Sequence, residues 1–165
     1  MSNIAIVQEY DRFTYFVDTA VGTIIDGELY RIRDNKAEKT HLVGNDIVFM
    51  SGGEQEINLT LTKMYDLLDN RGHIKTDNLQ SYLQKKFPGA LNPDKKFSQA
   101  GVAILSIIDG KTQIIGMTQG LNGCNDYQII KVDTPHKGKL RLSVDGIENV
   151  FINEKIKECN KARHL

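Results

Sequence analysis

Three places in the sequence combine a residue type that can do chemistry with a position at the end of an apolar run. Ser2 precedes the first apolar run, Asp18 closes the second, and the triplet 51–53 (Ser-Gly-Gly) follows the run 47–50. A hydroxyl can act as a nucleophile, and backbone N–H groups can bind a developing negative charge. Each place also has a purely structural interpretation. A small second residue is common, an aspartate after a strand accepts turn hydrogen bonds, and glycine permits unusual dihedral angles where a helix begins.

The sequence around these places is dominated by short runs of apolar and β-branched residues, which predict strands. Asp26-Gly27 and Gly44-Asn45 lie between such runs and are two-residue hairpin signals. We expect one block of strands before residue 52 and a second block after residue 100. The predicted strands cover 3–8, 13–17, 23–25, 29–32, 40–43 and 46–51 in the first block, and 102–108, 112–117, 127–132 and 140–144 in the second.

Between the two blocks the apolar residues follow the period of a helix. The first predicted helix has Gly72 as its expected C-terminal stop. The second begins at Thr76, a good capping residue, and ends before Pro88-Gly89. The apolar stripe of the first helix is Ile57, Leu61, Met64 and Leu68, and that of the second is Leu79, Tyr82, Leu83 and Phe87.

The last residues of the chain are charged and predict a final helix over 153–163. Its inward positions would be Ile152, Ile156 and Cys159. Strands gathered into blocks and separated from helices are typical of α+β proteins with antiparallel sheets. We therefore expect a single α+β domain over 1–165, with two sheets or one large bent sheet, and with the helix pair on an outer face.

The composition excludes several classes of function. Lys plus Arg and Asp plus Glu each number 21, so the formal net charge is zero. A general nucleic-acid surface needs a basic excess, so we expect no nucleic-acid partner. Every apolar stretch is far shorter than the ~20 residues that span a bilayer. The N-terminus lacks the pattern of a signal peptide, and we expect a cytoplasmic protein with no membrane partner.

The cysteines and histidines give no sign of a metal or cofactor. Cys124 and Cys159 form no CxxC motif, so we expect two reduced thiols and no zinc. The phosphate-binding and nucleophile-elbow glycine motifs are missing from the sequence. Four histidines have no metal-type spacing and are expected to be non-catalytic, namely His41, His73, His136 and His164.

The order of these features resembles the N-terminal nucleophile hydrolases, and among them the proteasome β-subunits and the HslV peptidases. In that family a hydroxyl residue opens the first strand, and the second strand ends in Ala-Asp-Ser/Thr, here 17–19 (Val-Asp-Thr). A later strand begins near a lysine and leads into Ala/Ser-Gly-Gly, here 39–53. A hairpin follows the helices, here 105–120. The similarity covers about 2–132 and implies an αββα sandwich of antiparallel sheets, with the second helical layer reduced.

The resemblance also implies a role for each candidate residue. The α-amine of Ser2, with a pKa of about 8 in an ordinary chain, would be the general base for its own hydroxyl. Lys39, or else Lys36, would supply a cation near the nucleophile, and Asp18 would hold that lysine. Backbone N–H groups at the glycine hinge, with Gly52 as the family position, would form the oxyanion hole.

The sequence departs from the active family members at several positions, so two functions stay open. Ile6 stands where they keep a glycine, 133–136 stands where they carry a serine-rich segment, and Met1 precedes Ser2. We predict a catalytically silent, proteasome-like domain that serves as an assembly or binding subunit. The alternative is a peptidase or amidase with Ser2 as nucleophile. The resemblance implies self-association and a peptide or protein ligand. Thr23, exposed by cleavage after the preceding glycine, is a rival nucleophile.

Overall fold

A computed structural model of the chain describes seven stretches of residues, namely 4–19, 21–25, 28–34, 38–51, 54–86, 101–119 and 127–144. The strands of the first block are β1 (Ile4–Gln8), β2 (Phe13–Val17), β3 (Val21–Ile25), β4 (Glu28–Asp34), β5 (Thr40–Val43) and β6 (Asp46–Ser51). The helices are α1 (Glu54–Asp66) and α2 (Thr76–Lys86). The strands after the helices are β7 (Gly101–Ile108), β8 (Lys111–Gln119), β9 (Tyr127–Val132) and β10 (Arg141–Val144).

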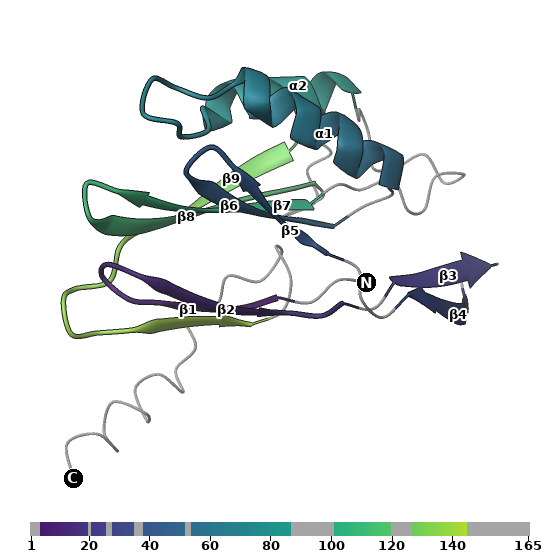
Figure 1. The fold of residues 1–165 in the computed structure, drawn as a ribbon, viewed down its shortest axis with the longest axis horizontal. Coiled ribbons are helices and arrows are strands. Elements are labelled where there is room, and N and C mark those ends of the chain that lie inside the picture. The colour runs from purple at the N-terminus through teal and green to yellow at the C-terminus, as the bar shows by residue number, and fades with distance from the viewer. Residues whose placement is uncertain are drawn as a thin grey trace, which may run out of the picture.

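The described residues form an α+β fold of stacked layers, as the sequence predicts (Figure 1). One sheet has the strand order β5-β6-β7-β8-β9, and a second has the order β10-β1-β2. All strand pairs in both sheets are antiparallel. Helices α1 and α2 cover one face of the five-stranded sheet, and the three-stranded sheet lies against its other face. The predicted helix 153–163 lies outside the described residues.

Each sheet takes strands from both blocks of the sequence. β6 of the first block pairs with β7 of the second, with Phe49 opposite Ala103. β1 of the first block pairs with β10 of the second, with Ile6 opposite Ser143. The two blocks of strands in the sequence therefore do not correspond to the two sheets. Each sheet instead pairs strands that are far apart in the sequence.

The central sheet is buried on both faces because its strands alternate between two apolar cores. On β7, Val102 and Ile104 face the helices, whereas Ala103 and Leu105 face the three-stranded sheet. From the helices, Met64 and Leu79 enter the first core. Burying a large apolar side chain contributes about 1.5–3 kcal/mol. The near-continuous apolar run of β7 thus reflects a strand that is covered twice.

Helix α1 ends earlier than the sequence predicts. It stops at Asp66, and the expected stop residue Gly72 lies six residues further on, in the connection to α2. There Gly72 has a φ of +78°, and its carbonyl oxygen accepts a hydrogen bond from the Asn45 N–H at 2.8 Å. The positive φ of Gly72 therefore belongs to the contact between the α1–α2 connection and the β5–β6 turn, and not to the end of α1. Leu68, predicted in the helical stripe, instead forms a β-bridge with Ile74.

Strands β3 and β4 form a separate two-stranded sheet that projects from the body of the molecule (Figure 1). In the sequence this hairpin lies between Thr19 and Glu38. Thr23 lies inside β3, opposite Arg31. Cleavage before this threonine would therefore cut a paired strand, which weighs against it as the nucleophile.

A polar contact joins the two sheets at the end opposite this hairpin. Gln8 of β1 and Thr112 of β8 are both fully buried, and Gln8 Nε2 donates to Thr112 Oγ1 at 3.1 Å. Thr112 Oγ1 in turn donates to the carbonyl oxygen of Glu9 at 2.5 Å. These bonds fix the separation and register of the two layers. No helix among the described residues has the length and apolarity needed to cross a membrane.

Candidate functional site

Two of the residues singled out in the sequence form an ion pair. Lys39 Nζ donates a hydrogen bond to Asp18 Oδ2 at 2.6 Å. The lysine side chain is 8% exposed and the aspartate side chain 29% exposed. A contact of this length between charged groups is a strong, charge-assisted hydrogen bond. The pair therefore fixes an ammonium group at a nearly buried position.

Strand ends place both residues. Asp18 directly follows β2, and Lys39 directly precedes β5. The carbonyl oxygen of Lys39 accepts a hydrogen bond from the Met50 N–H at 3.4 Å, so Lys39 lies beside the end of β6. Ser51 is the last residue of β6 and begins the Ser-Gly-Gly triplet. The pair thus lies where β2 ends, β5 begins and the chain approaches α1.

The start of β1 belongs to the same neighbourhood. Ile4, the first described residue of β1, pairs with Val17, the residue before Asp18. Ser2 is two residues earlier in the chain, and two residues span at most about 7 Å. Ser2 itself lies outside the described residues, as do Gly52 and Lys36. The structure therefore brings together Asp18 and Lys39, and it describes the strands that lead to the other candidates.

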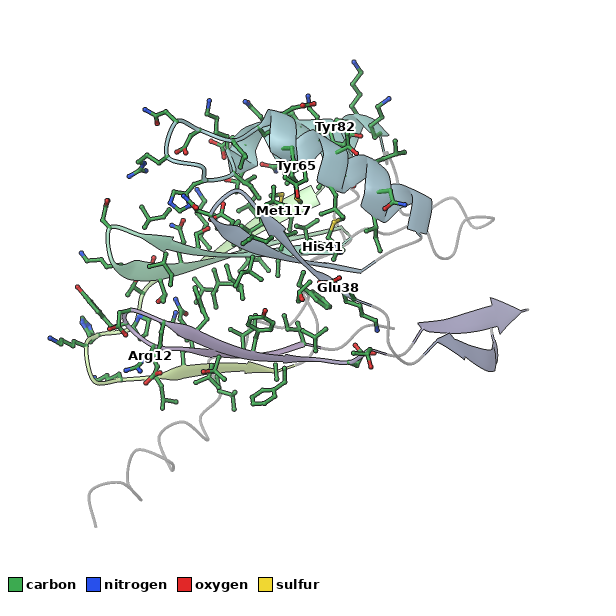
Figure 2. All side chains as sticks on the ribbon, in the orientation of Figure 1. Arg12, Glu38, His41, Tyr65, Tyr82 and Met117 are labelled. Carbon is green, nitrogen blue, oxygen red and sulfur yellow. The ribbon has the colours of Figure 1, made fainter. Side chains whose placement is uncertain are left out.

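Figure 2 locates this site in the layered fold. Glu38, the neighbour of Lys39, lies at a level between the two stacked sheets and toward the β3–β4 hairpin, whereas Arg12 marks the opposite end of the three-stranded sheet. His41 of β5 lies on the same side as Glu38, and Tyr65 and Tyr82 lie on the helices. The Asp18–Lys39 pair is therefore at the hairpin end, away from the Gln8–Thr112 contact.

The net stability gained from such a pair is small. Removing an ammonium from water costs several kcal/mol, and the attraction to one carboxylate offsets this only when the geometry is good. An apolar pair of similar volume would often stabilise a fold equally well. Stability alone therefore gives little reason for a charged pair at this position.

A second polar cluster, which sequence reasoning missed, lies at the other end of β6. Asp46 is fully buried, and its Oδ1 is 2.7 Å from His73 Nδ1. Its Oδ2 accepts the N–H of Ile74 at 2.7 Å. The residues between Asp46 and Met50 span about 13 Å along the strand, which separates this cluster from the Lys39 site. Asp46 and His73 are 27 positions apart, and nothing local in the sequence links them.

The Asp46–His73 pair holds the α1–α2 connection against the β5–β6 turn. The Asn45 side chain donates to the carbonyl oxygen of Arg71 at 2.8 Å, and Asp69 accepts the N–H groups of Arg71 and His73. These hydrogen bonds close a loop or join two loops, so the cluster is a structural clamp. Within the described ranges, no three His, Cys, Asp or Glu side chains are grouped as metal ligands.

Comparison with known proteins adds no family assignment. No protein-family model matches the sequence, and no curated protein shows significant similarity to it.

Proposed function

We propose that this chain is an N-terminal serine hydrolase of peptide or amide bonds, with Ser2 as nucleophile and with Lys39 as the cation beside it. The observation that carries the proposal is the nearly buried ion pair between Lys39 and Asp18 at the head of β1. The resemblance of the sequence to the N-terminal nucleophile hydrolases assigns these two residues the same roles. The αββα sandwich of that family is part of the proposal.

The chemistry follows from placing an ammonium group near an N-terminal serine. The free α-amine of Ser2 accepts the hydroxyl proton as Oγ attacks the carbonyl carbon of the substrate. The Lys39 ammonium favours the neutral form of that amine and stabilises the developing alkoxide, while Asp18 keeps the ammonium in place. The amine then passes the proton to the leaving nitrogen, and water releases the acyl group from Oγ. Backbone N–H groups at Gly52 would bind the oxyanion.

A second candidate is the catalytically silent assembly or binding subunit that the sequence predicts first. Exposed apolar side chains on β5 and α1 favour it, since Leu42 is 68% exposed and Tyr65 56% exposed. A hydrogen bond from Tyr65 Oη to the carbonyl oxygen of Leu42 joins them into one surface. Self-association or a peptide or protein ligand would use such a surface. The two candidates differ in what they require of Ser2 and Lys39.

Covalent labelling of the N-terminal residue separates the candidates. The protein, after removal of whatever precedes Ser2, is incubated with a peptide epoxyketone, which needs both a hydroxyl and an adjacent free amine. Intact mass and peptide mapping then show whether Ser2 carries the label. The hydrolase is expected to be labelled once per chain. The Ser2→Ala and Lys39→Met variants are expected to remain unlabelled, while Lys137→Met, at an exposed position, is expected to label normally.

The results divide cleanly. Labelling that depends on both Ser2 and Lys39 supports the hydrolase. A protein that keeps Met1 in the cell and shows no labelling after its removal supports the silent subunit. Light scattering of the same samples tests self-association, and a monomer over a wide concentration range would count against a ring-forming role. Thermal melts of each variant show whether lost labelling reflects lost folding.

A further inference from the structure

The joint between the two sheets contains a buried amide whose nitrogen is hydrogen-bonded and whose oxygen is not. Gln8 is fully buried at the end of β1, the middle strand of the three-stranded sheet, on the side that Arg12 marks in Figure 2. Its Nε2 donates to Thr112 Oγ1 at 3.1 Å and to the Thr112 carbonyl oxygen at 3.4 Å. Its Oε1 is also buried, and no donor of the described residues bonds to it. A buried acceptor without a donor costs stability, so this oxygen indicates a donor from outside the chain.

The amide of Gln8 cannot satisfy its oxygen by turning over. The Thr112 hydroxyl has one hydrogen, which it donates to the carbonyl oxygen of Glu9 at 2.5 Å, so its oxygen accepts from Gln8. The Thr112 carbonyl oxygen can only accept. Reversing the amide would place Oε1 against that carbonyl oxygen and would take the N–H groups of Gln8 away from their two acceptors. The amide oxygen is therefore the group that needs a further partner.

Three segments close over this amide and separate it from bulk water. The β1–β2 turn is held by a hydrogen bond from the Glu9 N–H to the Arg12 carbonyl oxygen at 2.9 Å. The Tyr10 carbonyl oxygen of the same turn accepts the Thr112 N–H at 3.0 Å, and Thr134 Oγ1 donates to the Thr112 carbonyl oxygen. A carbonyl oxygen has two lone pairs, so the turn carbonyls that accept one hydrogen bond can accept a second. The enclosure thus offers acceptors and lacks a donor for the amide oxygen.

We propose that an internal water molecule is bound between the two sheets at this place. It donates one hydrogen to Gln8 Oε1 and the other to a carbonyl oxygen of the β1–β2 turn. Buried waters typically make about three hydrogen bonds to polar groups that have no other partner. The water completes the polar contact between β1 and β8 and is part of the joint between the two layers. The proposal does not depend on the proposed function.

A metal ion is the competing occupant of this place. Mg²⁺ and Ca²⁺ take about six or more oxygen ligands and favour carboxylates. The side chains that meet here, Gln8 and Thr112, are both uncharged. The Glu9 carboxylate is 3.0 Å from Nε of Arg12 and its side chain is 36% exposed, so its charge is already paired at the surface. A cation would be buried without a compensating charge, which is costly, whereas water is a neutral donor.

A high-resolution crystal structure of the unaltered chain tests the proposal directly. A water peak is expected at about 2.8 Å from Gln8 Oε1, with a second polar partner on the β1–β2 turn. A protein donor bonded to Oε1, or no density beside this oxygen, would overturn the proposal. A peak with about six oxygen ligands at about 2.0–2.6 Å would be a metal ion and would overturn it equally.

Relaxation dispersion of water deuterons and oxygen-17 gives an independent test in solution, because it counts the water molecules that exchange slowly with the solvent. Gln8→Met keeps the shape of the side chain and removes the amide, so the count is expected to fall by one. Gln113→Met is the matched control, since Gln113 follows Thr112 on β8 and lies on the opposite face of the sheet. This variant is expected to keep the full count. Equal counts in the two variants would contradict the proposal. Thermal melts check that both variants fold, and the crystal structure decides alone if Gln8→Met does not.

Discussion

Lys39 Nζ lies 2.6 Å from Asp18 Oδ2, although the two residues are 21 positions apart and the whole β3–β4 hairpin intervenes. The hairpin forms its own sheet. After it, the chain comes back to the place where β2 ended, and Lys39 there directly precedes β5. The pair thus joins the end of β2 in the three-stranded sheet to the start of β5 in the five-stranded sheet. This arrangement makes the lysine a testable part of the site.

Replacing Lys39 by Met should remove the ammonium group that lies 2.6 Å from the Asp18 carboxylate. Breaking a buried pair costs about 3–5 kcal/mol, but Asp18 is 29% exposed, so water reduces the expected loss to about 1–2 kcal/mol. Urea unfolding measures the change in the free energy of unfolding. The double variant Asp18→Asn/Lys39→Met should recover part of that stability without recovering epoxyketone labelling. Recovery of both would show that the pair has only a structural role.

Replacing His73 by Ala should remove one of the two hydrogen-bonding partners of a fully buried carboxylate. Asp46 would keep the N–H of Ile74 but would lose the ring nitrogen at 2.7 Å. We expect a loss of about 2 kcal/mol in the free energy of unfolding, with labelling of Ser2 unchanged. His136→Ala, at an exposed position, is the control and should change stability by less than about 0.5 kcal/mol. Equal effects of the two substitutions would rule out the clamp.

Alanine substitutions at two glycines of similar backbone conformation distinguish the cost of backbone strain from the cost of steric overlap. Gly44 and Gly110 have φ values of +61° and +71°. A Cβ at Gly110 would meet nothing within 4 Å, so Gly110→Ala should cost about 1–2 kcal/mol from backbone strain alone. A Cβ at Gly44 would lie 2.3 Å from the carbonyl oxygen of Gly72, so Gly44→Ala should cost about 3 kcal/mol or more. Thermal or urea unfolding of both variants gives the comparison, and equal losses would contradict it.

The Asp69 carboxylate predicts a pH dependence of stability. The backbone N–H of His73 is the main cause that lowers the pKa of Asp69 below its ordinary value, and the backbone N–H and guanidinium of Arg71 add to it. Because the folded pKa is lowered, its stabilising contribution is complete above about pH 4 and is lost as the pH falls further. The stability difference between wild type and Asp69→Asn should therefore shrink below about pH 4. A difference that stays constant down to pH 2 would contradict this assignment.

Much of the secondary structure could be predicted from local pattern. The predicted strands 13–17, 40–43, 46–51 and 127–132 have the same bounds in the structure. Turn signals such as Gly44-Asn45 act within a few residues, so they can be recognised without knowing the fold. The end of α1 could not be predicted in this way. Gly72 looks like a helix stop, but its conformation is required by a contact with Asn45, which belongs to a distant turn.

The candidate site was predictable only through the order of several weak features. No single residue type marks Asp18 or Lys39, since an aspartate after a strand and a lysine in a charged loop are both ordinary. The resemblance supplied the pairing, and the structure shows the 2.6 Å contact. The Asp46–His73 pair had no such guide. A histidine in a turn and an aspartate at a strand start do not indicate each other until the fold brings them together.

The sequence by itself determined which segments are strands or helices and which of their faces are apolar, because side-chain period and turn chemistry are local properties. Only the tertiary structure decided that β1 lies between β10 and β2, that β6 lies beside β7, and that Asp18 meets Lys39. An apolar strand can pair with any other apolar strand of suitable length. The strand pairing is selected because both faces of the central sheet must be packed against a core at the same time. This packing requirement depends on the whole chain and cannot be read from any one segment.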